Sequence, residues 1–250
     1  MKRENWRVVA ASSIGGAILA LLVIFEFGGA ALLPVNRAAT ERTVHDYLVA
    51  HPEILVDMTA KLQANQEDQT RKERQIATDK LGTKAFFDPK VAFITGPANA
   101  KTTVVEFFDY NCPFCRASLP ALKKFYEKHK NDTRFAFIEF PIKGQDSVVV
   151  ARAAIAARKQ PGKYLDFHFA LMSEEGHVDA ATVFDVAKKA GLDIDRLRAD
   201  MKDTAIDTQI VAAEKLSEAA KIDGTPAFII NGKMREGALD DKLLAKMAKG

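Results

Sequence analysis

Two cysteines, Cys112 and Cys115, are the only cysteines among the 250 residues, and just Pro113 and Phe114 separate them. The apolar segment 103–108 before them predicts a strand, and the amphipathic segment 117–126 after them predicts a helix. Cys112 should then begin a helix as its exposed first residue, where the helix dipole and free backbone amides favour a thiolate. Cys115, one turn later, would resolve a mixed disulfide. The pattern indicates thiol–disulfide exchange.

Metal binding is the main alternative use of such a cysteine pair. Zinc sites need more ligands than one pair supplies, and no zinc-ligand spacing occurs among the five histidines, His45, His51, His129, His168 and His177. Cu(I) stays open because two thiolates suit a soft ion, although the six methionines are scattered. A purely structural disulfide would gain little stability from so short a loop. We therefore expect no resident metal, with Cys112 and Cys115 as the candidate Cu(I) ligands.

Two further positions point toward the same chemistry. Thr225-Pro226 stands directly before an apolar run, 227–230, that predicts a strand ending in an Asn-Gly turn. Glu106 lies inside the strand 103–108, on the inward face with Val104 and Phe108. A buried carboxyl costs free energy unless it has partners or stays protonated. The alternatives are an ordinary turn proline and an acid at a solvated strand edge.

Composition sets the broad class of the protein. A chain of 250 residues predicts one or two domains, and a hydrophobic content of 48% supports a real core. The net charge of +3 gives no case for nucleic acid. Two cysteines cannot build a disulfide scaffold, so they are expected to serve chemistry.

Residues 1–35 predict a signal or membrane-anchor segment. Lys2, Arg3 and Arg7 precede an uncharged run of 18 residues, 8–25, which indicates export with the N-terminus inside. A usual signal core has roughly 7–15 residues, and about 20 span a bilayer. An inner-membrane anchor is therefore slightly favoured over cleavage near Gly29-Ala-Ala31. In a bacterium, the body of the protein would be periplasmic, where disulfide chemistry operates.

Residues 36–84 predict a helical N-terminal segment and a spacer. His51-Pro52 interrupts a helical pattern. The apolar residues of this pattern recur at helical spacing and are Val44, Tyr47, Leu48, Leu55, Met58 and Leu62. So narrow a stripe must pack on the main domain or on copies of itself. We favour self-association, with the polar stretch 63–75 as a helical or flexible spacer.

Residues 85–250 predict an α/β domain. Strands are expected at 91–94, 103–108, 134–140, 227–230 and 233–236, and a closing helix at 239–249. Between the third and fourth strands, the region of about 145–221 has helical patterns at 148–157, 164–172, 180–190, 194–201 and 204–220. The order predicts a mixed sheet interrupted by a large helical insertion.

Taken together, these motifs resemble the thioredoxin superfamily, and the insertion resembles its DsbA subfamily. The resemblance implies a cis Pro226 opposite Cys112, Thr225 beside the sulfurs, and Glu106 relaying a proton to Cys115. With His51-Pro52-Glu53 and the charged spacer, the chain looks like the suppressor-of-copper-sensitivity protein C group. Members of that group can be trimeric isomerases held together by the N-terminal segment. The implied partners are misfolded or cysteine-containing exported proteins and a membrane redox partner, with no cofactor beyond the Cys112–Cys115 disulfide.

The residues between and opposite the cysteines favour an isomerase or reductase. Phe114 stands where the strong oxidase DsbA has a histidine, and it offers neither a hydrogen bond nor a positive charge. We therefore expect a Cys112 pKa near the upper part of the range of roughly 3.5–7.5, which makes the pair less oxidising. Thr225, rather than valine, is also the residue of periplasmic isomerases. A DsbA-type oxidase and a Cu(I)-binding copper-tolerance protein remain the alternatives, whereas intact Cys112, Cys115 and Pro226 disfavour a non-catalytic adaptor.

Overall fold

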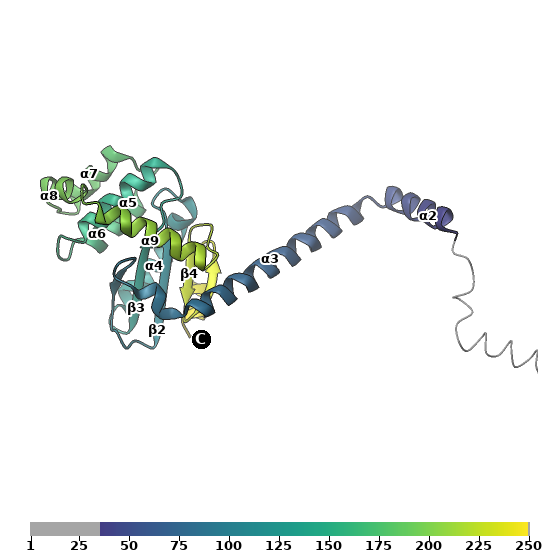
Figure 1. Cartoon of the computed structure of the whole chain (residues 1–250), viewed down its shortest axis with the longest axis horizontal. Coiled ribbons are helices and arrows are strands. Elements are labelled where there is room, and N and C mark those ends of the chain that lie inside the picture. The colour runs from purple at the N-terminus through teal and green to yellow at the C-terminus, as the bar shows by residue number, and fades with distance from the viewer. Residues whose placement is uncertain (1–35, 250) are drawn as a thin grey trace, which may run out of the picture. The chain divides into compact units, whose positions relative to one another are not determined.

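The computed structural model describes residues 36–249, and the chain divides between Gln63 and Ala64 into two units. The division falls inside a helix, rather than at residues 84 and 85, where the sequence pattern separated spacer from domain. The elements are labelled in Figure 1, and their order is α2(Arg37–Ala50), α3(Glu53–Leu81), η2(Thr83–Phe87), β1(Phe93–Thr95), β2(Thr102–Phe108), α4(Pro113–His129), β3(Thr133–Glu139), α5(Gln145–Ala157), α6(Tyr164–Ser173), α7(Ala180–Lys189), α8(Ile194–Asp200), α9(Ala205–Ala219), β4(Ala227–Ile230), β5(Lys233–Glu236) and α10(Asp241–Lys249).

The first unit contains α2 and the start of α3. Asn36 caps α2, because its side-chain oxygen accepts from the Ala39 amide at 3.2 Å. The helix ends at His51, whose amide bonds to the Tyr47 carbonyl. Pro52 follows, just before the first turn of α3, where its missing N–H costs nothing. The interruption therefore falls where the sequence predicted it.

The apolar stripe of the first unit has no core. Helix α2 buries none of its residues. Large apolar side chains of α2 and α3 are each more than half exposed, namely Val44, Tyr47, Val49, Leu55, Val56, Met58 and Leu62. A helix pair that cannot bury its apolar residues gains little stability from packing.

The second unit begins with the C-terminal part of α3. The polar stretch 63–75 is helical, and Thr78 near the end of this helix is buried. The η2 turn follows and places Phe86 in the core, with an exposed fraction of 0%. Sequence analysis missed this turn, because one buried aromatic in a short 3-10 segment leaves no periodicity to read.

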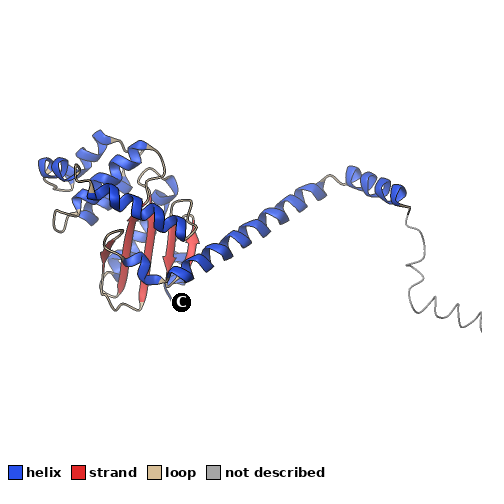
Figure 2. Ribbon diagram, viewed as in Figure 1, coloured by secondary structure: helices blue, strands red, loops and turns tan. Residues whose placement is uncertain are grey.

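A five-stranded sheet in the order β1-β3-β2-β4-β5 forms the centre of the second unit (Figure 2). Strands β2 and β3 are parallel, and the other neighbours are antiparallel. The five predicted strands are all present: β4 and β5 have the predicted bounds, and the ends of β1, β2 and β3 differ by at most two residues. The predicted α/β fold, a mixed sheet interrupted by a large helical insertion, is confirmed.

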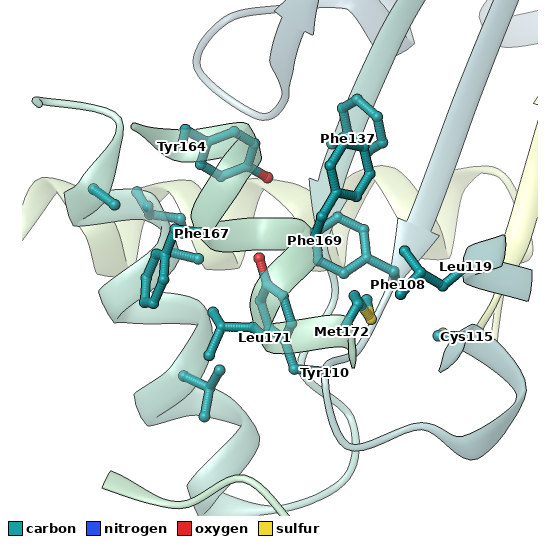
Figure 3. Packing of buried hydrophobic residues seen from close by; sticks show 14 of the residues in the cluster. Phe108, Tyr110, Cys115, Leu119, Phe137, Tyr164, Phe167, Phe169, Leu171 and Met172 are labelled. Carbon is teal, nitrogen blue, oxygen red and sulfur yellow. The ribbon is translucent and has the colours of Figure 1, made fainter. Parts of the chain in front are cut away.

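Both faces of this sheet are buried, and β2 divides its side chains between them. Val104 and Phe108 belong to the larger apolar cluster, which also contains residues of α4, α6 and α10 (Figure 3). Val105 and Phe107 belong to a second cluster with Phe86. Burial on both faces explains why β2 reads as a nearly continuous apolar run, and Glu106 is the polar exception.

The insertion comprises α5 to α9 and lies in sequence between β3 and β4. Helix α5 contacts α6, α7, α8 and α9, while α6 contacts α4. The insertion therefore packs on the helix that begins at Cys112. Sequence analysis placed all five of these helices, because each is long enough to show its period.

Within residues 36–249, no helix combines the length and apolar character needed to cross a membrane. The expected signal or anchor segment, 1–35, lies outside the described residues.

Candidate active site

Cys112 is the N-cap residue of α4, and Pro113 occupies the first turn. Proline suits this position because the amide that it lacks would be unpaired there. The Cys112 amide bonds to the Asp109 carbonyl at 3.1 Å, which forms the turn between β2 and α4. The Cys112 thiol donates to the Thr225 carbonyl at 3.1 Å. Two segments more than a hundred residues apart thus meet at one sulfur.

Burial at the cysteines differs from the expectation that Cys112 would be exposed. Its exposed fraction is 1%, the same as that of Cys115, because the segment that contains Thr225 covers its sulfur. Phe114, between the cysteines, is instead 62% exposed. A large exposed apolar side chain beside a buried sulfur gives an incoming polypeptide a surface to contact.

The two thiols have opposite pKa shifts. A hydrogen bond from the Cys115 thiol, together with the Thr225 side chain and the amides of Cys115 and Phe114, lowers the pKa of Cys112 to about 5 despite burial. This value is below the expected upper range, since the second thiol and the amides do what a histidine would otherwise do. Burial, the bond to Cys112 and the charge of Glu106 raise the pKa of Cys115 far above its usual range. Near neutral pH, Cys112 is a thiolate and Cys115 a thiol.

Glu106 lies in the middle of β2 and is 2% exposed. Phe137 and Phe228 are its neighbours in register on the adjacent strands. Burial, followed by the Cys112 charge, raises the pKa of Glu106 to about 8. Among the described residues, its Oε2 atom has no hydrogen-bond partner. A carboxyl that titrates close to neutral pH suits general acid–base transfer.

The Thr225–Pro226 peptide bond is cis, and Pro226 directly precedes β4. The Thr225 carbonyl points to the Cys112 sulfur, whereas the Pro226 carbonyl accepts from the Gly237 amide at 2.9 Å. The structure thus brings Thr225 and Pro226 to the cysteines, with Glu106 in the strand that precedes them. No three His, Cys, Asp or Glu side chains among residues 36–249 form a metal-binding group.

Sequence analysis missed the polar residues that fix the turn before Cys112. Asp109 is 2% exposed and accepts from the Asn111 amide, the Ser147 hydroxyl and the Lys143 amide at 2.7–2.8 Å. Asn111 in turn bonds to both backbone groups of Val178. The polar residues Asp109 and Asn111 beside the cysteines were the available signal in the sequence. Their partners Ser147 and Val178 lie in the insertion, far along the chain, so the contacts could not be predicted.

A buried polar cluster supports Tyr110, two residues before Cys112. Its hydroxyl lies 3.0 Å from His168 Nδ1, and in Figure 3 it points toward the hydroxyl of Tyr164. Tyr164 donates to Glu139 at 2.7 Å, and Arg158 pairs with the same carboxyl. Burial, followed by the charge of Arg158, lowers the pKa of His168 to about 3. His168 therefore stays neutral and serves packing rather than proton transfer.

Comparisons with known proteins agree with this geometry. The thioredoxin family model matches residues 88–249, and the copper resistance protein ScsC N-terminal domain matches residues 37–69. A thioredoxin-like oxidoreductase from Silicibacter pomeroyi is 34% identical, with a TM-score of 0.62, and the match covers 67% of this chain and 96% of that one. Proteus mirabilis ScsC in a transitional conformation is 27% identical, with a TM-score of 0.61, and the match covers 88% and 96%.

Curated relatives include much longer proteins. A Na(+)/H(+) antiporter, NhaA 1 of Salinispora arenicola, is 29% identical over 160 residues, which cover 63% of this chain and 24% of the antiporter. The chain therefore spans about a quarter of the length of the first curated relatives that it matches.

Proposed function

The chain belongs to the thioredoxin family and has the fold of a DsbA- and ScsC-type thiol–disulfide oxidoreductase, and from this premise we propose that it is a protein disulfide isomerase or reductase. Its redox centre is Cys112-Pro113-Phe114-Cys115. The substrates are misfolded or cysteine-containing exported proteins. The resting state for isomerisation is the dithiol, since a thiolate must attack first.

The opposite pKa shifts of the two thiols are the observation that carries the thiol–disulfide exchange in this proposal. Near neutral pH, the Cys112 thiolate attacks one sulfur of a substrate disulfide, and the other substrate sulfur leaves as a thiolate. In isomerisation, a different substrate thiolate attacks the mixed disulfide and releases Cys112 again, with no net change in oxidation. In reduction, Cys115 loses its proton and attacks Cys112, which oxidises the pair and reduces the substrate. Glu106 is the group that takes up the Cys115 proton.

The N-terminal unit favours isomerase over oxidase. A low Cys112 pKa suits an oxidase equally well, because it stabilises the reduced enzyme. Isomerisation, however, benefits from several sites around one substrate, since a second site then acts at a high effective concentration. The exposed stripe of α2 and α3 suits a small homo-oligomer, for which we propose a trimer, and exposed Phe114 suits contact with unfolded chains.

Refolding of scrambled ribonuclease by residues 36–250 tests the function. We expect the reduced protein to restore ribonuclease activity faster than the Cys112→Ser variant. Residues 64–250 are the matched comparison, because this fragment keeps the whole second unit. Rapid oxidation of reduced ribonuclease without any rescue of the scrambled form would identify an oxidase instead.

The proposed location is the periplasm, with residues 1–35 as an inner-membrane anchor. The support is the basic, then apolar, composition of that segment. Fractionation of cells that produce the tagged full chain tests the location and the anchor, because an anchored protein stays with the membrane after a high-salt wash.

The cysteine pair must be returned to the dithiol after each reduction, so it needs a redox partner. We propose that this partner is a membrane protein.

Cu(I) handling is a second candidate function. The N-terminal match to a domain described as copper resistance protein ScsC favours it, and Cys112 and Cys115 supply two soft sulfur ligands. Titration of the reduced protein with Cu(I) against a competing chelator is the test. We expect Cys115→Ser to lose the binding if the pair is the site, and equal affinity in that variant would exclude it.

A further inference from the structure

Arg74 in the C-terminal part of α3 binds the segment that leads to the cis proline. Its Nε donates to the Lys221 carbonyl at 2.9 Å, and its Nη2 donates to Asp223 at 2.6 Å. Its Nη1 pairs with Glu236 of β5. The Arg74 side chain is only 14% exposed, whereas its partner Asp223 lies at the surface.

The partners of Arg74 flank the cis peptide on both sides. Asp223 lies two residues before Thr225, and the Lys221 backbone has a positive φ of 57°. On the other side, Glu236 is opposite Ala227 in register, directly after Pro226. The Arg74 guanidinium therefore joins residues 221–223, which precede the cis-proline loop 224–226, to strand β5, which pairs with the residue after that loop.

The neighbours of Arg74 strengthen the same attachment. Glu73 accepts from the Lys221 ammonium at 2.8 Å. Gln75 donates to the Gly232 carbonyl at 2.8 Å and accepts from the Met234 amide at 2.9 Å. The Gln75 amide thus satisfies backbone groups at the β4–β5 turn and on the edge strand β5, which would otherwise stay open.

We propose that Arg74 is a positioning residue for the cis-proline loop, and that residues 64–81 of α3 are part of the catalytic unit. The proposal rests on the proposed thiol–disulfide exchange. Arg74 does not touch the sulfurs. It restrains Asp223 and Glu236, and so it fixes the Thr225 backbone beside the Cys112 sulfur and keeps that backbone in place for a substrate peptide.

An isolated surface ion pair would not have this role, because such pairs contribute little. Arg71 provides the contrast on the same helix. It pairs only with Asp68 of α3 and is 60% exposed. Arg71 and Arg74 are one turn apart, so changes to either alter helix propensity and charge in the same way.

Arg74→Gln, with Arg71→Gln as the matched control, tests the proposal in residues 36–250. The reaction is the reduction of a disulfide-containing peptide, followed as separate KM and kcat values. We expect Arg74→Gln to raise KM roughly tenfold, because the variant loses charged hydrogen bonds. The value of kcat should change less than about threefold. Arg71→Gln should match the parent protein, and Arg74→Lys should restore part of the KM, because it keeps the charge but not the fork.

Asp223→Asn is an independent test of the positioning role if Arg74→Gln folds poorly. Asp223 is 81% exposed, so its loss should leave the fold intact while raising KM by a smaller factor. Unchanged KM in both Arg74→Gln and Asp223→Asn would overturn the proposal, as would equal effects of Arg71→Gln and Arg74→Gln. Failure of the parent protein to reduce even a small organic disulfide would instead count against the proposed function.

Discussion

Apolar side chains of the second unit are buried on both faces of the sheet, whereas most large apolar side chains of α2 and the start of α3 are more than half exposed. Both regions carry large aliphatic and aromatic residues at regular spacing, so composition does not separate them. In the second unit, the helices cover the apolar side chains of the strands. The two helical segments of the first unit have too narrow a stripe to do the same.

The difference teaches that the two regions use apolar surface for separate purposes. In the second unit, burial stabilises the fold and shifts the pKa of Cys115 and Glu106 upward. In the first unit, the exposed apolar surface is the part of the chain to which we assign the proposed oligomer. If that proposal holds, separate variants should remove the chemistry and the assembly.

Loss of Cys112 should have the largest effect and should be confined to the second unit. Cys112→Ser should abolish exchange, because no other described thiol is a thiolate near neutral pH. Cys115→Ser should instead accumulate mixed disulfides with substrate, visible on non-reducing gels. Light scattering should give the parent mass for both variants. Faster alkylation of Cys115 than of Cys112 by iodoacetamide would reverse the assignment.

Removal of residues 36–62 should leave chemistry intact and abolish assembly. We expect a monomer that still oxidises dithiols or reduces disulfides but loses isomerase activity, measured by light scattering and scrambled-substrate refolding. The point variant Leu55→Asp should have the same effect in weaker form. Ile76→Asp is the control, because Ile76 is 67% exposed on the part of α3 that belongs to the second unit. A monomeric mass for the parent residues 36–250 would break the comparison.

Opposing pH dependences should appear in the unfolding free energy of the reduced protein. Folding lowers the pKa of Cys112 from 9.0 to about 5, so the unfolded chain holds the extra proton and stability rises with pH in that window. Folding raises the pKa of Glu106 from 4.5 to about 8, so the folded chain holds the extra proton and stability falls with pH. The slopes, each about 1.4 kcal/mol per pH unit, should largely cancel.

Single variants separate these two slopes. Glu106→Gln should leave stability rising between about pH 5 and pH 9, the window of the Cys112 shift. Cys112→Ser should leave stability falling, over a narrower window, because part of the Glu106 shift comes from the thiolate. Urea unfolding of the reduced proteins measures both. Flat profiles in the two variants would contradict the opposing shifts.

Loss of Glu106 should have the smallest effect on catalysis, because it should slow a single step. Glu106→Gln should slow release of the mixed disulfide roughly tenfold near pH 7, because Cys115 then lacks a nearby base for its proton. Quenched-flow measurement of mixed-disulfide decay tests this, with circular dichroism as the check on folding. Equal decay rates for parent and variant from pH 6 to 8, around the Glu106 pKa of about 8, would remove this carboxyl from the mechanism.

Local patterns predicted most of the fold. The strand before Cys112, the helix after it, the five strands and the helices of the insertion all carry a readable period. Thr225-Pro226 before β4 was also readable, because proline at the start of a strand marks a special turn. Phe86 in η2 was not, since so short a segment leaves too few residues to show a pattern.

The sequence by itself determined which residues could perform the chemistry, because the two cysteines, the acid in an apolar strand and the proline before another strand are local facts. Only the tertiary structure decided how they work. It buried Cys112 under Thr225 and lowered its pKa without a histidine. It also joined Arg74 to Asp223 and Glu236, across about 150 residues of chain. Hydrophobic period depends on neighbours along the chain, whereas pKa values and polar contacts depend on neighbours in space.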